Sequence, residues 1–313
     1  MRRVTRALGP LVGLGLFAGA VWLLRQEFGE HSLREVGVAL RALPLPRLLL
    51  SLLFTGLGYT ALSCQDLLAL KTLDLRLPPR KAALAGFVGF AFANSLPFAV
   101  VTGGAVRARF YAGARLSPRD TTQLVLFNTA TYAIGLLAAA GLAFTFDPDA
   151  IPGLLRLPLH STRPLGEIAL VLLAGFLLWS WRGGPILRIR GHTLRPTSLR
   201  MSAARLGVSL LDWIFSGAAL FVLLQGSDAL GFPGFLGVFM LGQIAGLVAQ
   251  LPGGIGVFEA VVVGTLDPAI PVTAVLGALF AYRVIYFLLP LVIAAVILAV
   301  HELRHAGRRS RQS

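Results

Sequence analysis

Two short segments combine a proline, a glycine pair and a charged side chain at the end of a long apolar run. The first, NSLPFAVVTGGAVRARF, contains Pro97 and Gly103-Gly104, followed by Arg107 and Arg109. Arginine guanidinium groups bind phosphate through two parallel hydrogen bonds. A helix that restarts after glycine also offers free N–H groups to an anion. This segment therefore predicts a phosphate-binding site beside an interrupted helix.

The second segment, AQLPGGIGVFEAVVVG, repeats the pattern with an acid in place of the arginines. Pro252, Gly253 and Gly254 precede Glu259, which lies in an apolar run without another charge. Such a residue is a functional candidate, here to balance the arginines or to bind a head-group amine. Alternatively, Glu259 begins a returning helix, where the helix dipole favours an acid. Paired interruptions in two halves of a chain are typical of the central site of a transporter.

The first segment also has a purely structural interpretation. Glycine pairs in membrane helices most often allow close packing of neighbouring helices, which would explain Gly103 and Gly104. Arg107 and Arg109 could serve only as anchors at the membrane surface. The sequence leaves these alternatives open.

Other polar side chains lie inside apolar runs. Asp66 ends one run, and it could pair with Lys71 at the membrane surface or have a functional role. Asp212 and Arg283 each cost a few kcal/mol at the bilayer centre unless they are paired or hydrated. Arg283 could pair with Asp212 or with Glu259. Four amides could form hydrogen bonds between helices: Asn94, Asn128, Gln243 and Gln250.

Composition indicates a polytopic membrane protein. Of 313 residues, 56% are hydrophobic and 13% are charged, whereas soluble domains carry about 25% charged residues. The net charge of +14 lies in loops and tails, which fits contact with anionic lipid rather than nucleic acid. The single cysteine, Cys64, excludes a disulfide framework. No ATP-binding P-loop, metal-ligand set or catalytic triad occurs in the sequence, so we expect no cofactor, no metal and no enzymatic activity.

Eight apolar runs approach the length of about 20 residues that a transmembrane helix needs. The first has a basic head and small residues typical of a signal peptide, but its length favours a retained helix. The run that contains the first break would extend about 21 Å as a helix before the break, against a hydrocarbon core of about 30 Å. The eight runs are 7–24, 47–70, 82–101, 121–146, 165–181, 203–225, 232–251 and 272–300.

The charges in the loops indicate which runs cross. If all eight crossed, the arginine-rich loop 182–202 would lie outside, against the positive-inside rule. The charges fit if 82–112 enters from the cytoplasm and returns to it, and 232–266 does the same from outside. Non-helical backbone at such a depth must be covered by protein or line a wet cavity, so the predicted breaks at Pro97 and Pro252 imply an internal site.

The predicted fold is an all-α polytopic membrane protein with about six full transmembrane helices and two re-entrant helical hairpins of opposite sense. A single integral membrane domain covers 1–313, with inverted-repeat-like halves at about 45–146 and 203–300. Residues 301–313 form a basic cytoplasmic tail. The head and the tail are both basic, so we expect both termini on the cytoplasmic side of the cytoplasmic membrane.

Four segments carry a more specific pattern: GYTALSCQDLLALK, FANSLPFAVVTGGAVRARFYAGARLSP, LPGGIGVFEAVVV and GALFAYRVIYFLLPLVIA. Together they resemble the membrane flippase domain of bacterial lysylphosphatidylglycerol synthases (MprF proteins) and its stand-alone relatives. The resemblance covers about residues 45–300, and the motifs GG-x-x-R-x-R-x-Y and P-G-G-x-G-x-x-E carry most of its specificity. It implies a bundle that moves phospholipids between leaflets, with charged functional positions at Asp66, Arg107 and Glu259.

The sequence departs from the synthases in two respects. Their membrane part is followed by a soluble aminoacyl-transferase domain, whereas this sequence ends at HELRHAGRRSRQS, so we expect no synthesis of lysyl-lipid. In addition, Cys64-Gln65-Asp66 stands where many synthases have an aromatic residue before the acid. The first departure bears on whether the substrate is an aminoacylated lipid.

The leading hypothesis is a flippase or scramblase-like transporter of anionic or aminoacylated phospholipid, with phospholipids and anionic lipid head groups as partners. One alternative is a non-transporting scaffold or regulator of a separately encoded lipid-modifying enzyme. Another is an ion-coupled secondary transporter, and a homo-oligomer is also open. The predicted substrate-binding residues are Asp66, Asn94, Gly103, Gly104, Arg107, Arg109, Gly253, Gly254, Glu259 and Arg283.

Overall fold

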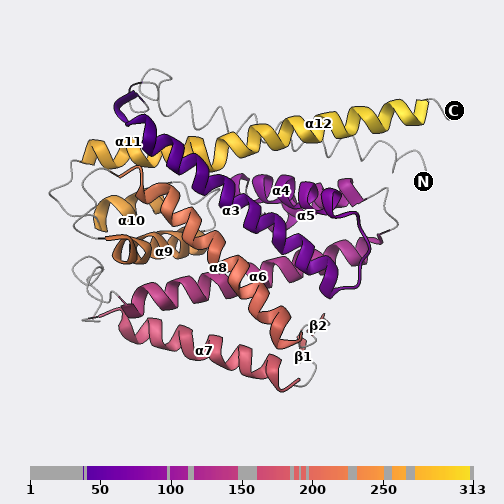
Figure 1. The fold of residues 1–313 in the computed structure, drawn as a ribbon, viewed down its shortest axis with the longest axis horizontal. Helices are drawn as coiled ribbons and strands as arrows, with labels where there is room; N and C mark the ends of the chain where they lie inside the picture. Colours follow the sequence, from indigo (N-terminus) through magenta and orange to yellow (C-terminus); the bar gives the residue numbers. More distant parts are fainter. Residues whose placement is uncertain are drawn as a thin grey trace.

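Long apolar helices form the bundle in Figure 1. The computed structural model describes residues 38, 41–96, 99–111, 116–146, 161–183, 187–189, 192–194, 197–224, 231–249, 256–265 and 272–310. Its long helices are α3 (Leu45–Thr72), α6 (Pro118–Phe146), α7 (Arg163–Trp181), α8 (Leu199–Phe221) and α9 (Gly231–Ala249). A last continuous rod consists of α11 (Val272–Tyr282), the π-helical segment η3 (Arg283–Leu288) and α12 (Leu289–Ser310). The shorter elements are α4 (Pro79–Ser95), α5 (Ala99–Tyr111), α10 (Val257–Thr265) and the antiparallel strands β1 (Leu187–Ile189) and β2 (His192–Leu194).

Six helices in the described part are long and apolar enough to cross a membrane, which makes the chain a multi-pass membrane protein. Five of them match predicted full spans. The sixth is α9, which the loop charges placed in a re-entrant segment, and that assignment stays a prediction. The predicted first run lies outside the described residues. The six candidate spans are Leu45–Thr72, Arg119–Phe146, Arg163–Trp181, Leu199–Phe221, Gly231–Val248 and Ala274–Arg304.

The predicted break in the run 82–101 is confirmed. Helix α4 ends at Ser95, and Leu96 has extended backbone angles, with φ −107° and ψ 153°. Leu96 precedes a proline, which disfavours helical angles at this position. A new helix, α5, begins at Ala99. Pro97 and the second predicted break, Pro252, lie outside the described residues.

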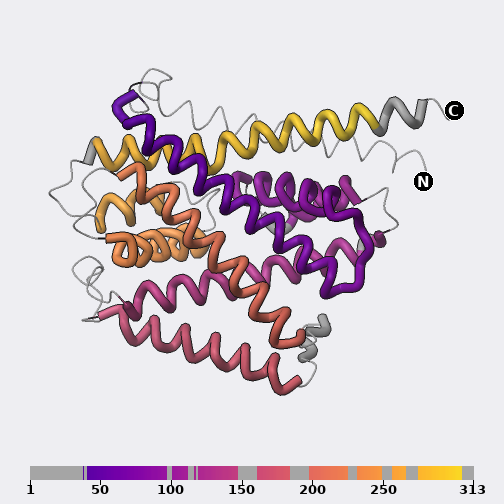
Figure 2. The backbone as a smooth tube through the Cα atoms, viewed as in Figure 1, coloured from indigo at the N-terminus to yellow at the C-terminus, as the bar shows by residue number. Residues whose placement is uncertain are grey.

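Helices α4 and α5 pack against each other, and α4 also contacts α3 and α12 (Figure 2). Gly89 and Ala93 of α4 lie next to Arg107 and Gly103 of α5 respectively. The absence of side chains on the two glycines allows the helices to approach closely. The site described below depends on this close approach.

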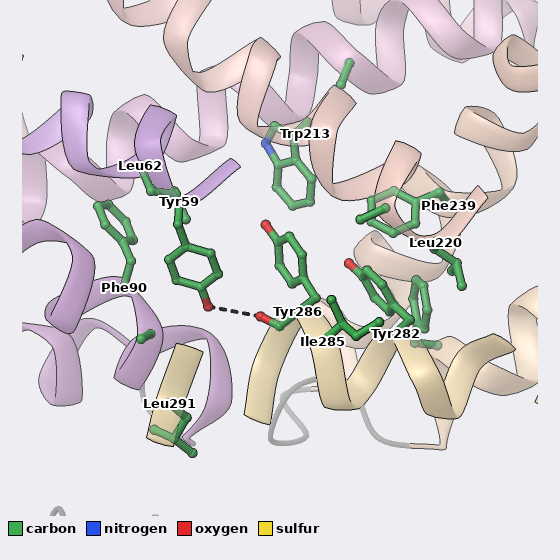
Figure 3. Packing of buried hydrophobic residues seen from close by; sticks show 14 of the residues in the cluster. Tyr59, Leu62, Phe90, Trp213, Leu220, Phe239, Tyr282, Ile285, Tyr286 and Leu291 are labelled. Atoms are coloured by element: carbon green, nitrogen blue, oxygen red, sulfur yellow. Dashed lines mark hydrogen bonds between the residues drawn. The ribbon is translucent and has the colours of Figure 1, made fainter. Parts of the chain in front are cut away.

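The rod is irregular where it passes the centre of the bundle. In η3, the carbonyl oxygens of Tyr286 and Phe287 accept hydrogen bonds from Tyr59 Oη at 3.2 Å and Ser95 Oγ at 3.5 Å. Figure 3 shows the first of these bonds, between α3 and η3. Short π-helical segments occur frequently at functional sites. Through the hydrogen bond from Ser95, η3 places the end of α4 in contact with the last membrane helix.

Candidate functional site

A buried ion pair lies where α3, α5 and α6 meet. Asp66 accepts hydrogen bonds from Arg107 Nε, at 3.1 Å to Oδ1 and 2.9 Å to Oδ2. Tyr111 Oη donates to Asp66 Oδ2 at 3.0 Å, and Asn128 Nδ2 donates to Oδ1. The Arg107 guanidinium also lies over the Phe90 ring, 4.4 Å from its centroid. Both charged side chains are almost inaccessible, at 3% for Arg107 and 0% for Asp66.

Three glycines shape the space around this pair. A Cβ atom at Gly89 would lie 2.8 Å from Arg107 Cζ, and one at Gly103 would lie 2.9 Å from Arg107 Nη1. A Cβ atom at Gly86 would lie 3.2 Å from Asp66 Cγ. Any side chain at Gly89 or Gly103 would therefore push the guanidinium away. Gly103 thus contributes packing space next to the predicted phosphate-binding arginine.

The arginine retains unused hydrogen-bonding capacity. Asp66 binds it through Nε, and within the described part of the chain Arg107 Nη2 has no hydrogen-bond partner although it is buried. A buried donor without a partner is costly and calls for an explanation. An anion bound beside Arg107 would supply the missing acceptor without displacing Asp66.

Arg107 lines a cavity of about 270 Å³ inside the bundle. Two helix ends reach this cavity, because Asn94 near the end of α4 and Gly246 and Leu247 near the end of α9 line its wall. Leu247 is exposed, so this wall includes a residue at the surface of the bundle. The remaining lining residues are Phe90, Ala93, Val125, Asn128, Thr129, Tyr132, Asp212, Trp213, Ser216, Gln243, Tyr286 and Phe287.

The same cavity contains an acid. Asp212 of α8 is buried and accepts a long hydrogen bond from Tyr286 Oη, at 3.4 Å. The cavity is therefore lined by one guanidinium, one carboxylate and several neutral polar groups. Within a mostly apolar wall, such a set can orient a small polar group.

Arg283 pairs with Glu259, which decides between the two partners that the sequence allowed. Arg283 Nε and Nη2 donate to Glu259 Oε1 at 2.8 and 2.6 Å. The backbone N–H of Gly256 donates to Glu259 Oε2 at 2.7 Å, so the acid also caps the start of α10. Neither member of the pair is among the described residues that line the cavity. Glu259 and Arg107 therefore lie in two separate ion pairs.

The remaining predicted residues have structural surroundings of their own. Arg109 forms a two-pronged pair with Glu302 of α12, at 2.8 and 2.5 Å. A Cβ atom at Gly104 would lie 3.4 Å from the Val125 side chain, so this glycine sits at the contact of α5 with α6. Lys71 is exposed, while Asp66 binds Arg107. Gly253 and Gly254 lie outside the described residues.

Sequence reasoning missed two contributors to the site, Gly86 and Gly89. Their spacing of three places both on one face of α4, and the segment AGFVGF shows this stripe of small residues. Tyr111 was part of the recognised motif, but nothing in the sequence assigned it as a hydrogen-bond donor to an acid on another helix.

The fold and site define a polytopic helical membrane protein with an internal cavity and a buried Asp–Arg pair. The chain belongs to the family described as the lysylphosphatidylglycerol synthase TM region, whose profile matches residues 10–294. The predicted resemblance is thereby confirmed. The match is to the membrane region of the synthases.

Relatives of different lengths share this region. The uncharacterized protein slr0712 of Synechocystis sp. is 32% identical over 321 residues, covering 99% of this chain and 97% of the relative. Inner membrane protein YbhN of Escherichia coli is 30% identical over 243 residues, covering 76% and 75%. Phosphatidylglycerol lysyltransferase of Staphylococcus xylosus is 26% identical over 259 residues, which cover 81% of this chain but 29% of that enzyme.

Proposed function

We propose that this protein moves phospholipid between the two leaflets of a bacterial cytoplasmic membrane, as a flippase or scramblase-like transporter. The observation that carries the proposal is the cavity of about 270 Å³ lined by Arg107, whose Nη2 has no hydrogen-bond partner among the described residues. A phosphate head group crossing the bilayer needs a donor of this kind, because water is excluded from the hydrocarbon core. We propose an anionic or aminoacylated phospholipid as the substrate.

In this proposal Asp66 positions the arginine. From α3, Asp66 accepts hydrogen bonds from Arg107 Nε, and Tyr111 and Asn128 donate hydrogen bonds that fix Asp66 in turn. The terminal nitrogen Nη2 is then available to the phosphate while the ion pair stays intact. Because Asp66 offsets the charge of Arg107, the head group is bound without becoming trapped by a full positive charge.

The family supports the proposal. The resemblance to the synthases implies a membrane domain that moves phospholipid, and several relatives are named phosphatidylglycerol lysyltransferases. YbhN is named an inner membrane protein, which supports the proposed location in the cytoplasmic membrane.

We further propose that α4–α5 and α9–α10 are re-entrant hairpins of opposite sense, related by an inverted repeat, and that both termini are cytoplasmic. The ends of α4 and α9 both reach the cavity, as expected for two broken segments that meet near the midplane. The end of α3, the starts of α6 and α8 and the ends of α7 and α12 lie on the right of the bundle in Figure 1. Basic residues are more frequent at these ends (Lys71, Arg119, Arg182, Arg200 and Arg304) than at the opposite ends of the same helices, which carry Arg47 and Arg163.

The experiment is reconstitution of the purified protein in liposomes with head-group-labelled phosphatidylglycerol, cardiolipin or aminoacylated lipid. We expect the accessibility of the label in the outer leaflet to change with time in a protein-dependent way. Arg107→Gln should slow this change about tenfold or more, the effect of losing one charge-assisted hydrogen bond. Arg109→Gln is the matched control, because Arg109 lies on the same helix but pairs with Glu302.

Absence of protein-dependent movement for all three lipids would refute the proposal and leave two hypotheses, a scaffold or regulator and an ion-coupled secondary transporter. Equal rates for the wild type and Arg107→Gln would instead show that transport does not use the assigned site. Gel filtration of each variant in detergent checks that it is folded.

A further inference from the structure

Asp212 differs from the other acids that face the interior of the bundle. Asp66 is paired with Arg107, and Glu259 is paired with Arg283. Across the described ranges no lysine, arginine or histidine forms a salt bridge with Asp212, which is nevertheless 3% exposed and lies in the middle of α8. An uncompensated carboxylate at this depth is costly and is typical of a functional position.

The groups around Asp212 come from each neighbouring element and are almost all neutral. Gly58 leaves space on the α3 side, where a Cβ atom would lie 3.6 Å from Asp212 Oδ1. Figure 3 shows the hydroxyl groups of Tyr282 and Tyr286 pointing toward the helix that carries Trp213, which is next to Asp212 in the chain. The titratable groups within range of its charge are Tyr59 of α3, Tyr132 of α6, Tyr282 of α11 and Tyr286 of η3.

The other helices around the cavity add one cation to this set. Helix α4 contributes Asn94 and α9 contributes Gln243, neither of which titrates. Helix α5 contributes Arg107, whose charge is already offset by Asp66. The cavity therefore carries an excess negative charge when Asp212 is ionised. A proton is the smallest cation that removes it.

We propose that Asp212 is a proton-binding site that couples movement of an anionic phosphate head group to proton transfer across the membrane. The inference rests on the proposed function, since it names the ion that accompanies the lipid. An ionised Asp212 and a phosphate would place two uncompensated negative charges in one cavity, where repulsion is strong because water is scarce. With a proton on Asp212, only the charge of the phosphate remains.

Proton and phosphate therefore bind together and leave together. The proton comes from water on the side where the lipid is loaded and forms an O–H bond with the Asp212 carboxylate. That bond breaks on the side where the lipid leaves, and the proton returns to water there. Loading exchanges one O–H bond of a hydronium ion for one O–H bond of the carboxylic acid, release reverses this exchange, and one proton accompanies one phosphate. The ionised carboxylate that remains disfavours rebinding of the anionic head group.

The test uses the whole protein in liposomes containing head-group-labelled phosphatidylglycerol or aminoacylated phosphatidylglycerol, at symmetric pH values from about 5.5 to 8.5 and with an imposed pH gradient. Transport by the wild type should rise as the pH falls, by at most about tenfold per pH unit, the limit for one titrating group. It should also respond to the gradient. Asp212→Asn resembles the protonated acid. Its transport rate should be high at all pH values, vary by less than about twofold across them and not respond to the gradient.

Asp74→Asn is the matched control. Asp74 is exposed in the turn after α3 and has φ 52°, a conformation that asparagine tolerates well. This variant should keep the pH response of the wild type. Tyr286→Phe provides a second test if Asp212→Asn does not fold. It removes the hydrogen bond to the ionised carboxylate, so the midpoint of the pH profile should move to higher pH.

Three results would overturn the inference while leaving the proposed function standing. The first is wild-type transport that does not respond to pH or to the gradient. The second is a pH profile that Asp212→Asn and Tyr286→Phe both leave unchanged. The third is selective loss of amine-bearing lipids in Asp212→Asn with an unchanged pH response, which would make Asp212 a head-group contact. Absence of any transport by the wild type would refute the proposed function and this inference with it.

Discussion

Gly89 lies against the Arg107 guanidinium. The substitution Gly89→Ala therefore tests whether the buried Asp66–Arg107 pair tolerates one added methyl group. A Cβ atom there would be 2.8 Å from Arg107 Cζ and 2.9 Å from Nη1. These distances are too short for atoms that are not bonded, so in Gly89→Ala the guanidinium must move. Its hydrogen bonds to Asp66, which is fully buried, would then be stretched or lost.

The expected change in the free energy of unfolding of Gly89→Ala follows from two opposing effects. Overpacking a buried site costs about 1–3 kcal/mol, while alanine gains up to about 1 kcal/mol over glycine in a helix. We therefore expect Gly89→Ala to lower the free energy of unfolding by up to about 2 kcal/mol. A lost hydrogen bond to a charged group is worth about 1.5–3 kcal/mol. If the phosphate loses such a bond in the transition state, transport slows about ten- to a hundredfold.

The assay compares thermal unfolding in detergent and lipid movement in liposomes across a small set of variants. Gly56→Ala is the control, because no atom lies within 4 Å of a Cβ atom at that position of α3. It should leave transport unchanged and stability equal or slightly higher. In an Arg107→Ala background, Gly89→Ala should cost nothing, since the atoms it would strike are gone.

Two results would refute this reasoning. One is a Gly89→Ala variant that matches Gly56→Ala in both stability and transport. The other is a cost of Gly89→Ala that persists unchanged in the Arg107→Ala background, which would mean that the glycine is needed for helix packing alone.

Three further sets of substitutions test the other charged contacts. Tyr111→Phe removes a hydrogen bond to a buried carboxylate and should lower the free energy of unfolding by about 1.5–3 kcal/mol, as measured by thermal unfolding in detergent. Arg109→Gln breaks a pair with Glu302 whose members are 21% and 31% exposed, so it should cost less than about 1 kcal/mol and change transport less than about twofold. Either Glu259→Arg or Arg283→Glu alone should cost about 3 kcal/mol. The combined exchange should recover part of that loss, which a double-mutant cycle of unfolding free energies measures.

The helices could be predicted because their causes are local. An apolar run of about 20 residues favours a membrane-crossing helix on its own account, and this predicts α3, α6, α7, α8 and the last rod. The end of α4 was predictable for the same reason, since the proline after Leu96 restricts the backbone of its immediate neighbour. The π-helical segment η3 was not predictable, because its irregularity accompanies hydrogen bonds from Tyr59 and Ser95 on other helices.

The candidate site could be predicted as residues but not as contacts. Arg107 and Asp66 stand out because each is charged within or beside an apolar run. Their pairing depends on how α3 packs against α5, which no local pattern encodes. Glu259 illustrates the same limit, since two arginine–acid combinations were open and only the packed helices choose between them. A glycine such as Gly89 acquires its role entirely from the atom opposite it.

Asp66 and Asp212 show how packing separates residues that composition treats alike. Both are aspartates in apolar helices, and a hydropathy scale assigns them the same cost. Asp66 has three donors, including an arginine, so its charge is compensated within the protein. Asp212 has one long hydrogen bond from a tyrosine, and no cation in the described part of the protein pairs with it. Asp66, whose charge is compensated, can hold Arg107 in place. The protonation state of Asp212, which lies beside the same cavity without a cation, can change with what the cavity contains.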